Sequence, residues 1–452
     1  MTLDKFFKPK SIAVIGASRD PNKIGHVILK NILDAGYKGK IYPINPKAEE
    51  ILNLKSYKSV LDIREEIDLA IIAVPAEFAI KVLEQCGKKE IEAVSMISAG
   101  FSEIGNEDAD EEIKEILKRY GIRMIGPNIL GILDAHTNLD TIFIPRLRLT
   151  RPHAGGISFI CQSGAVGSAT MDLVATQGYG FSKFISYGNA LDLNECDFLE
   201  YLGKDPKTKV ICLYLEGVKD GKRFLEVAKR VSKKKPIIAI KGGITEEGSE
   251  AVLSHTASLA GSFEIYKGLF KQTNIIHAKN LEELFTFARI LDKSMKPKGN
   301  KIQIITNGGG YGILATDSVS ENNLKLAVMS TETRKKIKRN TSTISTIKNP
   351  IDLAGDVTTK TYDVVIRECL YDKNIDIILL IVLMQTPLIG SDIVGVISEL
   401  NAQQKKPIIV VTTGGDFTEL HKRNLELRGI PCFTYPDSAV KAIKAMCDYY
   451  LH

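Results

Sequence analysis

Short runs of apolar residues alternate with longer amphipathic stretches from one end of the chain to the other. The apolar runs are rich in Ile and Val and are continuous, as is typical of strands buried on both faces of a parallel sheet. The longer stretches, such as residues 107–120, 220–233 and 391–401, carry the spacing of helices with one apolar face. This alternation predicts an α/β protein built from open parallel sheets. The strands that we expect are residues 11–15, 40–44, 69–74, 94–97, 156–161, 210–215, 237–240, 301–305, 377–384 and 408–411.

Two polar stretches rich in proline and basic residues interrupt this rhythm, at residues 145–156 and 293–300. We expect domain boundaries there, and a length of 452 residues suits about three domains. A third polar stretch, residues 331–350, has a strand–helix unit on each side and is expected to form a helix and a loop within the last domain. The predicted domains are residues 1–145, 146–292 and 299–452.

Composition narrows the class of protein. Apolar residues are 44% of the chain and charged residues 25%, as in an average globular protein, which excludes a disordered or fibrous chain. The net charge is only +6 and the basic residues are scattered, so nothing favours a nucleic-acid partner. The seven cysteines include no C-x-x-C pair, which argues against a zinc site or a disulfide framework and for a reducing compartment.

The sequence predicts neither a signal peptide nor a membrane-spanning segment. The first residues lack the pattern of a signal peptide, and the longest apolar run, residues 377–384, is too short to span a membrane. We therefore expect a cytoplasmic protein with no metal centre and no membrane association.

The first domain carries a small-residue turn that suits an anion. Gly16, Ala17 and Ser18 join the first strand to a helix that begins near Gly25, and Lys23 adds a positive charge. The turn is not G-x-G-x-x-G, and no acidic residue ends the second strand to hold a dinucleotide ribose. Lys47 follows that strand instead, and it suits a phosphate such as the 3′-phosphate of coenzyme A. A plain turn without a ligand stays open as an alternative.

Two further strand-end loops of this domain carry small or polar residues. They contain Val74 and Pro75 after the third strand, and Ser98 and Ala99 after the fourth. The carboxyl ends of parallel strands meet at one edge of a sheet, where such sheets bind their ligands. We expect all four loops to line one binding site.

The second domain repeats the pattern with Gln162, Ser163, Gly164 and Ala165 between a strand and a helix. Small residues at a helix start expose N–H groups that bind phosphate. A serine nucleophile is the competing interpretation, but Gly is missing at the position that G-x-S-x-G requires. We favour phosphate binding.

A later segment of this domain carries one histidine between Ser and Thr residues. His255 lies between the glycines at 242, 243, 248 and 261, which permit movement, and imidazole can accept a phosphoryl group. Glu216 ends another strand at the same edge and could orient the imidazole by a hydrogen bond. The alternatives are a surface loop with an inert histidine and a solvated glutamate.

The third domain has glycine turns at residues 306–312 and 412–416, each between a strand and a helix. They could bind another anion, but we favour a structural role.

The chain resembles, over its whole length, the α subunit of the NDP-forming acyl-CoA synthetases, relatives of succinyl-CoA synthetase, and specifically of ADP-forming acetate–CoA ligase. The SHT-x-SLAGS pattern around His255 is the most specific of the shared motifs. The segments that carry the resemblance are SIAVIGAS, IYPINPK, AVPAE, ISAGFSE, GPNILG, GGISFICQSGAVG, ISYGNALDLNECDFLEYL, LYLEGVKDG, SHTASLAGS, TNGGGYGILATD, NPIDLAGD and GIPCF.

The resemblance implies a fold and a set of roles. The fold would be an N-terminal Rossmann-like CoA-binding domain followed by two flavodoxin-like parallel-sheet domains. His255 would be phosphorylated beside Glu216, residues 162–165 would hold phosphate, and Asn128 would face the reacting end of the ligand. Coenzyme A would contact Gly16, Ala17, Ser18, Arg19, Lys47, Ile97, Ser98 and Ala99. Two departures, Ala257 and Asn22 in place of common glycines, remove no reacting group.

The family also needs an ATP-grasp module for ADP and Mg²⁺, which nothing in this sequence resembles. The resemblance therefore implies a separate ATP-grasp β subunit, an α2β2 assembly and acetate as the default acid. Three other classes stay in view. They are a nicotinamide oxidoreductase, a catalytically silent CoA-binding regulatory or scaffold protein, and the ligase-like part of a protein acetyltransferase.

Overall fold

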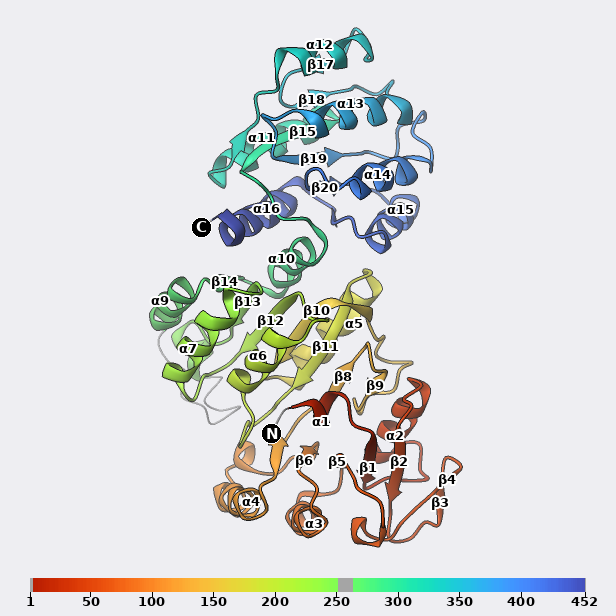
Figure 1. Cartoon of the computed structure of the whole chain (residues 1–452), viewed down its shortest axis with the longest axis vertical. Helices are drawn as coiled ribbons and strands as arrows, with labels where there is room; N and C mark the ends of the chain where they lie inside the picture. Colours follow the sequence, from red (N-terminus) through yellow and green to blue (C-terminus); the bar gives the residue numbers. More distant parts are fainter. Residues whose placement is uncertain (1–2, 251–262, 452) are drawn as a thin grey trace. The chain divides into compact units, whose positions relative to one another are not determined.

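The computed structural model describes residues 3–250 and 263–451. The chain divides into two compact units, residues 1–278 and 279–452. The first unit contains two large sheets and the second contains one (Figure 1).

The first sheet of the first unit is parallel throughout. Its central strands are fully buried, as their continuous apolar sequences predict, because helices cover the sheet. The predicted strands 11–15 and 40–44 are confirmed at both ends, and so is the helix predicted at 107–120. The strands in spatial order are β2 (Lys40–Ile44), β1 (Ser11–Ile15), β5 (Leu69–Ile72), β6 (Ala93–Met96) and β7 (Arg123–Ile125). The main helices are α2 (Ile24–Asp34), α3 (Ala76–Lys88) and α4 (Glu107–Tyr120), and a small hairpin pairs β3 (Glu50–Ile51) with β4 (Leu54–Lys55).

The second sheet has a parallel core extended by two antiparallel strands. In spatial order it contains β14 (Ile276–His277), β13 (Ile237–Lys241), β12 (Val210–Leu215), β10 (His153–Cys161), β11 (Gly180–Ser186), β8 (Ile132–Asp134) and β9 (Leu139–Asp140). Its helices include α5 (Gly164–Thr176), α6 (Glu195–Lys204), α7 (Gly221–Ser232) and α9 (Phe263–Thr273).

The predicted start of the strand at residue 156 is wrong. The polar stretch 145–156 already enters β10 at His153. Gly155 lies against Gly180 of β11 so closely that an added Cβ would stand 2.4 Å from the Gly180 carbonyl carbon. Two glycines facing each other let the strands pair where the polar sequence indicated a loop.

One hydrophobic core joins the two sheets of the first unit. It continues from Phe6, Ile12 and Ile28 through Ile129 and Ile132 to side chains of the second sheet. Strand β8 carries the chain out of the first sheet and pairs with β11, so the two sheets are held in a single compact unit.

The second unit repeats the parallel architecture in a single sheet. Its helix α10 (Leu281–Lys293) packs on α16 (Pro436–Leu451), and the Lys293 ammonium lies 2.7 Å from Glu426 Oε2. The division into three domains stays a prediction. The strands in spatial order are β17 (Thr346–Ile347), β18 (Ile351–Asp352), β15 (Lys301–Thr306), β19 (Ile377–Ile381), β20 (Ile408–Val411) and β21 (Cys432–Phe433), with β16 (Lys325–Leu326) also beside β15. The other helices are α11 (Gly309–Glu321), α12 (Thr331–Arg339), α13 (Thr359–Tyr371), α14 (Ile393–Ala402) and α15 (Asp416–Leu427).

The predicted α/β class with parallel sheets is confirmed for both units. Within residues 331–350 the predicted helix is α12, whereas the expected loop contains the short strand β17, antiparallel to β18. Among the residues that the structure describes, no helix is long and apolar enough to cross a membrane.

Lys183 of β11 is buried between two carboxylates, and its ammonium lies 3.1 Å from Asp134 Oδ2 and 2.7 Å from Asp205 Oδ2. Burial alone would raise the pKa of Asp205, but hydrogen bonds from Lys183 and Thr208 outweigh it and lower that pKa to about 2. We predict that Lys183→Met lowers the free energy of unfolding by about 3–5 kcal/mol, because it leaves two buried carboxylates without their cation.

Urea unfolding at pH 7 measures the change, and the exposed pair of Lys30 with Asp34 supplies the control Lys30→Met, expected to cost under about 1 kcal/mol. The contribution of Asp205 is present above its unfolded pKa of about 4 and is lost as the pH falls through 2. Equal costs for the two variants would contradict the prediction.

Candidate active site

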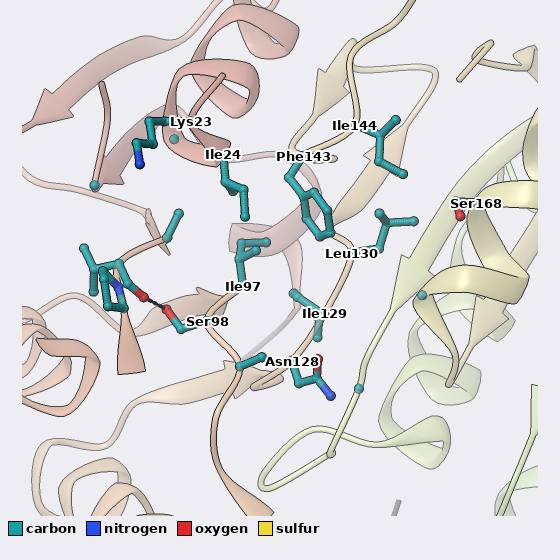
Figure 2. A pocket seen from close by; sticks show the side chains of 18 of the residues that line it. Lys23, Ile24, Ile97, Ser98, Asn128, Ile129, Leu130, Phe143, Ile144 and Ser168 are labelled. Atoms are coloured by element: carbon teal, nitrogen blue, oxygen red, sulfur yellow. Dashed lines mark hydrogen bonds between the residues drawn. The ribbon is translucent and has the colours of Figure 1, made fainter. Parts of the chain in front are cut away.

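The carboxyl ends of the two sheets of the first unit meet at a cavity of about 1070 Å³ (Figure 2). In each sheet the chain order reverses at one place, between β1 and β5 in the first and between β10 and β12 in the second. Ligands of open α/β sheets bind outside the strand ends at such switch points, because the helices leave on opposite faces there. The loops after all four of these strands line the cavity.

The turn after β1 brings backbone close to backbone. Gly16 has a φ of +94°, and a Cβ on it would stand 2.3 Å from the Ala73 carbonyl oxygen. A Cβ on Gly25, at the start of α2, would stand 1.9 Å from the Gly16 carbonyl oxygen. Glycine is therefore required at both positions for α2 to begin directly over the turn.

Side chains from neighbouring segments fix this turn. Asn45 Nδ2 donates to the Ala17 carbonyl at 2.7 Å, and His26 Nδ1 lies 2.8 Å from the Ser18 carbonyl. The Ser98 hydroxyl donates to the Val74 carbonyl at 2.5 Å and joins the loops after β5 and β6 (Figure 2). No role was predicted for His26, because its contact depends on the path of the turn.

Residues 162–165 form the start of α5 on the opposite side of the cavity. Ser163 is the N-cap, and its hydroxyl accepts from the Val166 N–H at 3.3 Å. Gly164 and Ala165 occupy the first turn, where backbone N–H groups lack intrahelical acceptors and can bind an anion. Burial raises the pKa of the Cys161 thiol well above its usual value, so this neighbouring group is neutral.

Glu216 follows β12 directly and is only 4% exposed, although it lines the cavity. The Glu216 and Gly217 N–H groups donate to Gln162 Oε1 at 2.8 and 3.2 Å. The Gln162 side chain therefore links the turn that opens α5 to the strand end that carries the carboxylate.

Asn128 lies between the two sides of the cavity. Its φ is +61°, its N–H donates to the Ser98 carbonyl at 2.9 Å, and its side-chain amide donates to Asn189 Oδ1 at 3.2 Å. The first contact is to the loop after β6 of the first sheet and the second is to the loop after β11 of the second sheet, so Asn128 links the two sides; its place at the reacting centre stays a prediction.

The structure brings most of the predicted site residues to one cavity. Arg19 and Lys47 do not line it, and the Arg19 guanidinium donates to the Glu50 carbonyl instead. His255 lies outside the described residues. The predicted residues that line the cavity are Gly16, Ala17, Ser18, Lys23, Val74, Pro75, Ile97, Ser98, Ala99, Asn128, Gln162, Ser163, Gly164, Ala165 and Glu216.

An apolar belt between the two polar sides was missed. It consists of Ile24, Ile97, Ile129, Leu130, Phe143 and Ile144, and of these only Ile97 was predicted (Figure 2). Asn31 Nδ2 holds the segment with Phe143 against α2 by donating to the carbonyls of Ile142 and Ile144 at 2.6 and 3.0 Å. The signal in the sequence was the short run Thr-Ile-Phe-Ile inside a polar region.

In the second unit, the glycine turn before α11 lies at the end of β15, and a Cβ on Gly309 would stand 2.8 Å from Asp352 Oδ2. The structural role that we favour for this turn stays a prediction.

Three family models match the chain in succession. A CoA binding domain matches residues 10–135, a succinyl-CoA ligase like flavodoxin domain matches 154–291, and a Ligase-CoA domain matches 302–450. Together with the cavity, these matches define the first unit as the CoA-ligase type of α/β protein.

Curated relatives match over nearly the whole chain. The α subunit of ADP-forming acetate–CoA ligase II of Pyrococcus furiosus is 41% identical over 98% of this chain and 97% of its own length. The ADP-forming acetate–CoA ligase of Methanocaldococcus jannaschii is 45% identical over 98% of this chain, which spans 62% of that longer relative. The solved structure of a dinucleotide-forming acetyl-coenzyme A synthetase 1 of Ca. Korarchaeum cryptofilum, in complex with phosphate and ADP, superposes with a TM-score of 0.93 at 37% identity, covering 99% of this chain and 96% of that one.

The chain therefore belongs to the ADP-forming acetate–CoA ligase family and corresponds to its α subunits. The resemblance stated from the sequence motifs is confirmed, and so is the fold that it implied, a Rossmann-like CoA-binding domain followed by flavodoxin-like domains. The roles of the individual site residues stay predictions.

The close approach at the first turn gives a structural prediction. Gly25→Ala places a methyl group where the Gly16 carbonyl stands, so we expect a loss of about 1–3 kcal/mol in the free energy of unfolding. Gly221→Ala, in the first turn of α7 with open space around it, is the matched control and should change stability by under about 1 kcal/mol. Urea unfolding compares the two, and a Gly25→Ala protein as stable as its control would refute the packing.

Proposed function

We propose that this chain is the α subunit of an ADP-forming acetate–CoA ligase, which converts acyl-CoA, phosphate and ADP reversibly to the acid, coenzyme A and ATP. The observation that carries the proposal is that the turns at Gly16–Ser18 and Ser163–Ala165 and the buried Glu216 carboxylate all line one cavity. The ligase names of the relatives that match the whole chain support it, and they do not support a silent scaffold protein.

Coenzyme A would lie along the cavity from the first sheet to the second. The turn at Gly16–Ser18 and the ammonium of Lys23 suit the phosphates of its nucleotide end. The apolar belt with Ile129 and Phe143 suits the less polar pantetheine arm, which would carry the thioester towards Asn128 and Gly164.

The first chemical step takes place beside α5. Inorganic phosphate held by the N–H groups of Gly164 and Ala165 attacks the thioester carbonyl carbon; a C–O bond forms, the C–S bond breaks, and coenzyme A leaves as its thiol after taking a proton. The N-terminal dipole of α5 stabilises the negative charge that develops on the phosphate and the carbonyl oxygen. The product is the acyl phosphate.

The second step moves the phosphoryl group to His255. An imidazole nitrogen forms the P–N bond while the P–O bond to the acyl group breaks and the carboxylic acid leaves as its anion. The Glu216 carboxylate accepts a hydrogen bond from the other ring nitrogen and stabilises the positive charge that the ring acquires. Transfer from phosphohistidine to ADP then completes the cycle.

A second chain would supply the nucleotide site. We propose an ATP-grasp β subunit that binds ADP and Mg²⁺, in an α2β2 assembly. Two relatives of matching length are named as α subunits, and the single-chain relatives extend well beyond the part that this chain matches. A cytoplasmic location belongs to the same proposal, since the cysteine spacing suits a reducing compartment.

The test is phosphorylation of the histidine. The chain and its ATP-grasp partner are incubated with acetyl-CoA and labelled phosphate, and the rate of appearance of an acid-labile, alkali-stable label is followed. We expect label on the wild type, none on His255→Ala, and a rate about 100-fold lower on Glu216→Gln, which cannot stabilise the imidazolium. A wild-type chain that binds coenzyme A but takes no label would contradict the proposed function.

A further inference from the structure

The peptide of Glu216 is held on both sides by side chains from the two strands that flank β12. These strands are β10 and β13 (Figure 1). Gln162 follows β10 and accepts from the Glu216 and Gly217 N–H groups at 2.8 and 3.2 Å. Lys241 ends β13, and its ammonium donates to the Glu216 carbonyl at 2.8 Å. These side chains replace the strand–strand hydrogen bonds at the point where the sheet ends.

Lys241 is built into this position. It is 4% exposed, its ammonium also donates to the Gly242 carbonyl, and it lies 5.0 Å from the centre of the Tyr266 ring. The Tyr266 hydroxyl in turn accepts from the Val218 N–H at 3.1 Å. Residues 216 and 218 are thus both fixed by groups that lie on β13 or α9.

Lys241 also interacts electrostatically with the Glu216 carboxylate. Within the described part of the chain, the Glu216 charge acts on the titratable groups of Cys161, Tyr187, Tyr214 and Lys241. Burial raises the pKa of the first three, so they are neutral, and Lys241 is the cation among the four. Burial lowers the pKa of Lys241 and the Glu216 charge opposes this, so carboxylate and ammonium favour each other's charged forms.

We propose that Gln162 and Lys241 are positioning residues that clamp the Glu216 peptide and hold its carboxylate beside the start of α5. The inference rests on the proposed function for what Glu216 does, and on the contacts above for how it is held. It assigns Gln162 a role towards Glu216 in addition to the predicted contact with phosphate. A shift of about 1 Å in such a group is enough to slow a reaction by about 100-fold.

Lys235, two residues before β13 begins, provides a matched control away from the active-site end of that strand. Its ammonium also donates to two backbone carbonyls, those of Leu202 and Asp205, and burial lowers its pKa as it does for Lys241. Lys235→Met and Lys241→Met therefore remove the same kind of contact, one just before β13 and the other at its end. Only the second removes it from the active-site end.

The first experiment is single-turnover labelling of the complex with acetyl-CoA and labelled phosphate. We expect Lys241→Met and Gln162→Met to slow labelling by about 10- to 100-fold while the dissociation constant for coenzyme A changes less than about 3-fold. Lys235→Met should label within about 3-fold of the wild type. In Lys241→Met the labelling rate should begin to fall at a higher pH as the solution is acidified, because the Glu216 carboxylate is protonated more easily once it loses a nearby cation. Wild-type rates and an unshifted pH profile would overturn the proposal.

The second experiment tests the clamp by a measurement that does not depend on the labelling reaction. Amide hydrogen exchange of residues 216–218 should accelerate at least about 10-fold in Gln162→Met and Lys241→Met but not in Lys235→Met. Unchanged exchange in all three overturns the clamp. If the wild type takes no label, the proposed function fails, whereas accelerated exchange at 216–218 would still support the clamp.

Discussion

The site depends on one constraint, which is that the first backbone N–H groups of a helix need acceptors from outside the helix. A parallel sheet whose strand order reverses sends its helices to opposite faces, so the turn at the reversal opens onto a crevice. In this chain two such reversals face one cavity, at Gly16 over Ala73 and at Ser163–Ala165 beside β12. The helix starts therefore offer N–H groups at both ends of the same space, and an extended ligand with phosphates at one end and an acyl group at the other suits that spacing.

A carboxylate beside an anion site is unfavourable unless its charge is compensated and its position is fixed. The position of Glu216 is fixed through its backbone, because Gln162 holds the two N–H groups of the turn and Lys241 holds the carbonyl. The ammonium of Lys241 also supplies the positive charge. The neighbouring thiol and phenols stay neutral on account of their burial, so they add no further negative charge.

The periodicity of the sequence predicted most of the fold, because continuous Ile and Val runs can only be satisfied by burial on both faces. It failed at β11 and β8, where the buried Lys183 looks like a surface residue until Asp134 and Asp205 are brought beside it. It also failed at His153, which pairs with Gly180 in β11 while Gly155 packs closely on that glycine, so that a polar stretch becomes a strand. In each case a contact between distant residues decides the structure, and no local pattern carries that information.

The candidate site divides in the same way. The strand-end loops after β1, β2, β5, β6, β10 and β12 were predictable because their position follows from the topology, and residues of each line the cavity. Apart from Ile97, the apolar belt was missed. The run Thr-Ile-Phe-Ile indicates burial but not its partner, because Leu130 and Phe143 reach the cavity through the pairing of β8 with β11 and the hold of Asn31 on residues 142–144. Arg19 was assigned from the resemblance, and Lys47 from its charge and its place after the second strand, and neither residue lines the cavity.

The most direct test of this account is a crystal structure of the chain with coenzyme A and inorganic phosphate. The account predicts phosphate within hydrogen-bonding distance of the Gly164 and Ala165 N–H groups, with the coenzyme extending along Ile129 and Phe143 to the turn at Gly16–Ser18. Phosphate bound elsewhere, or a coenzyme whose sulfur points away from the start of α5, would contradict it.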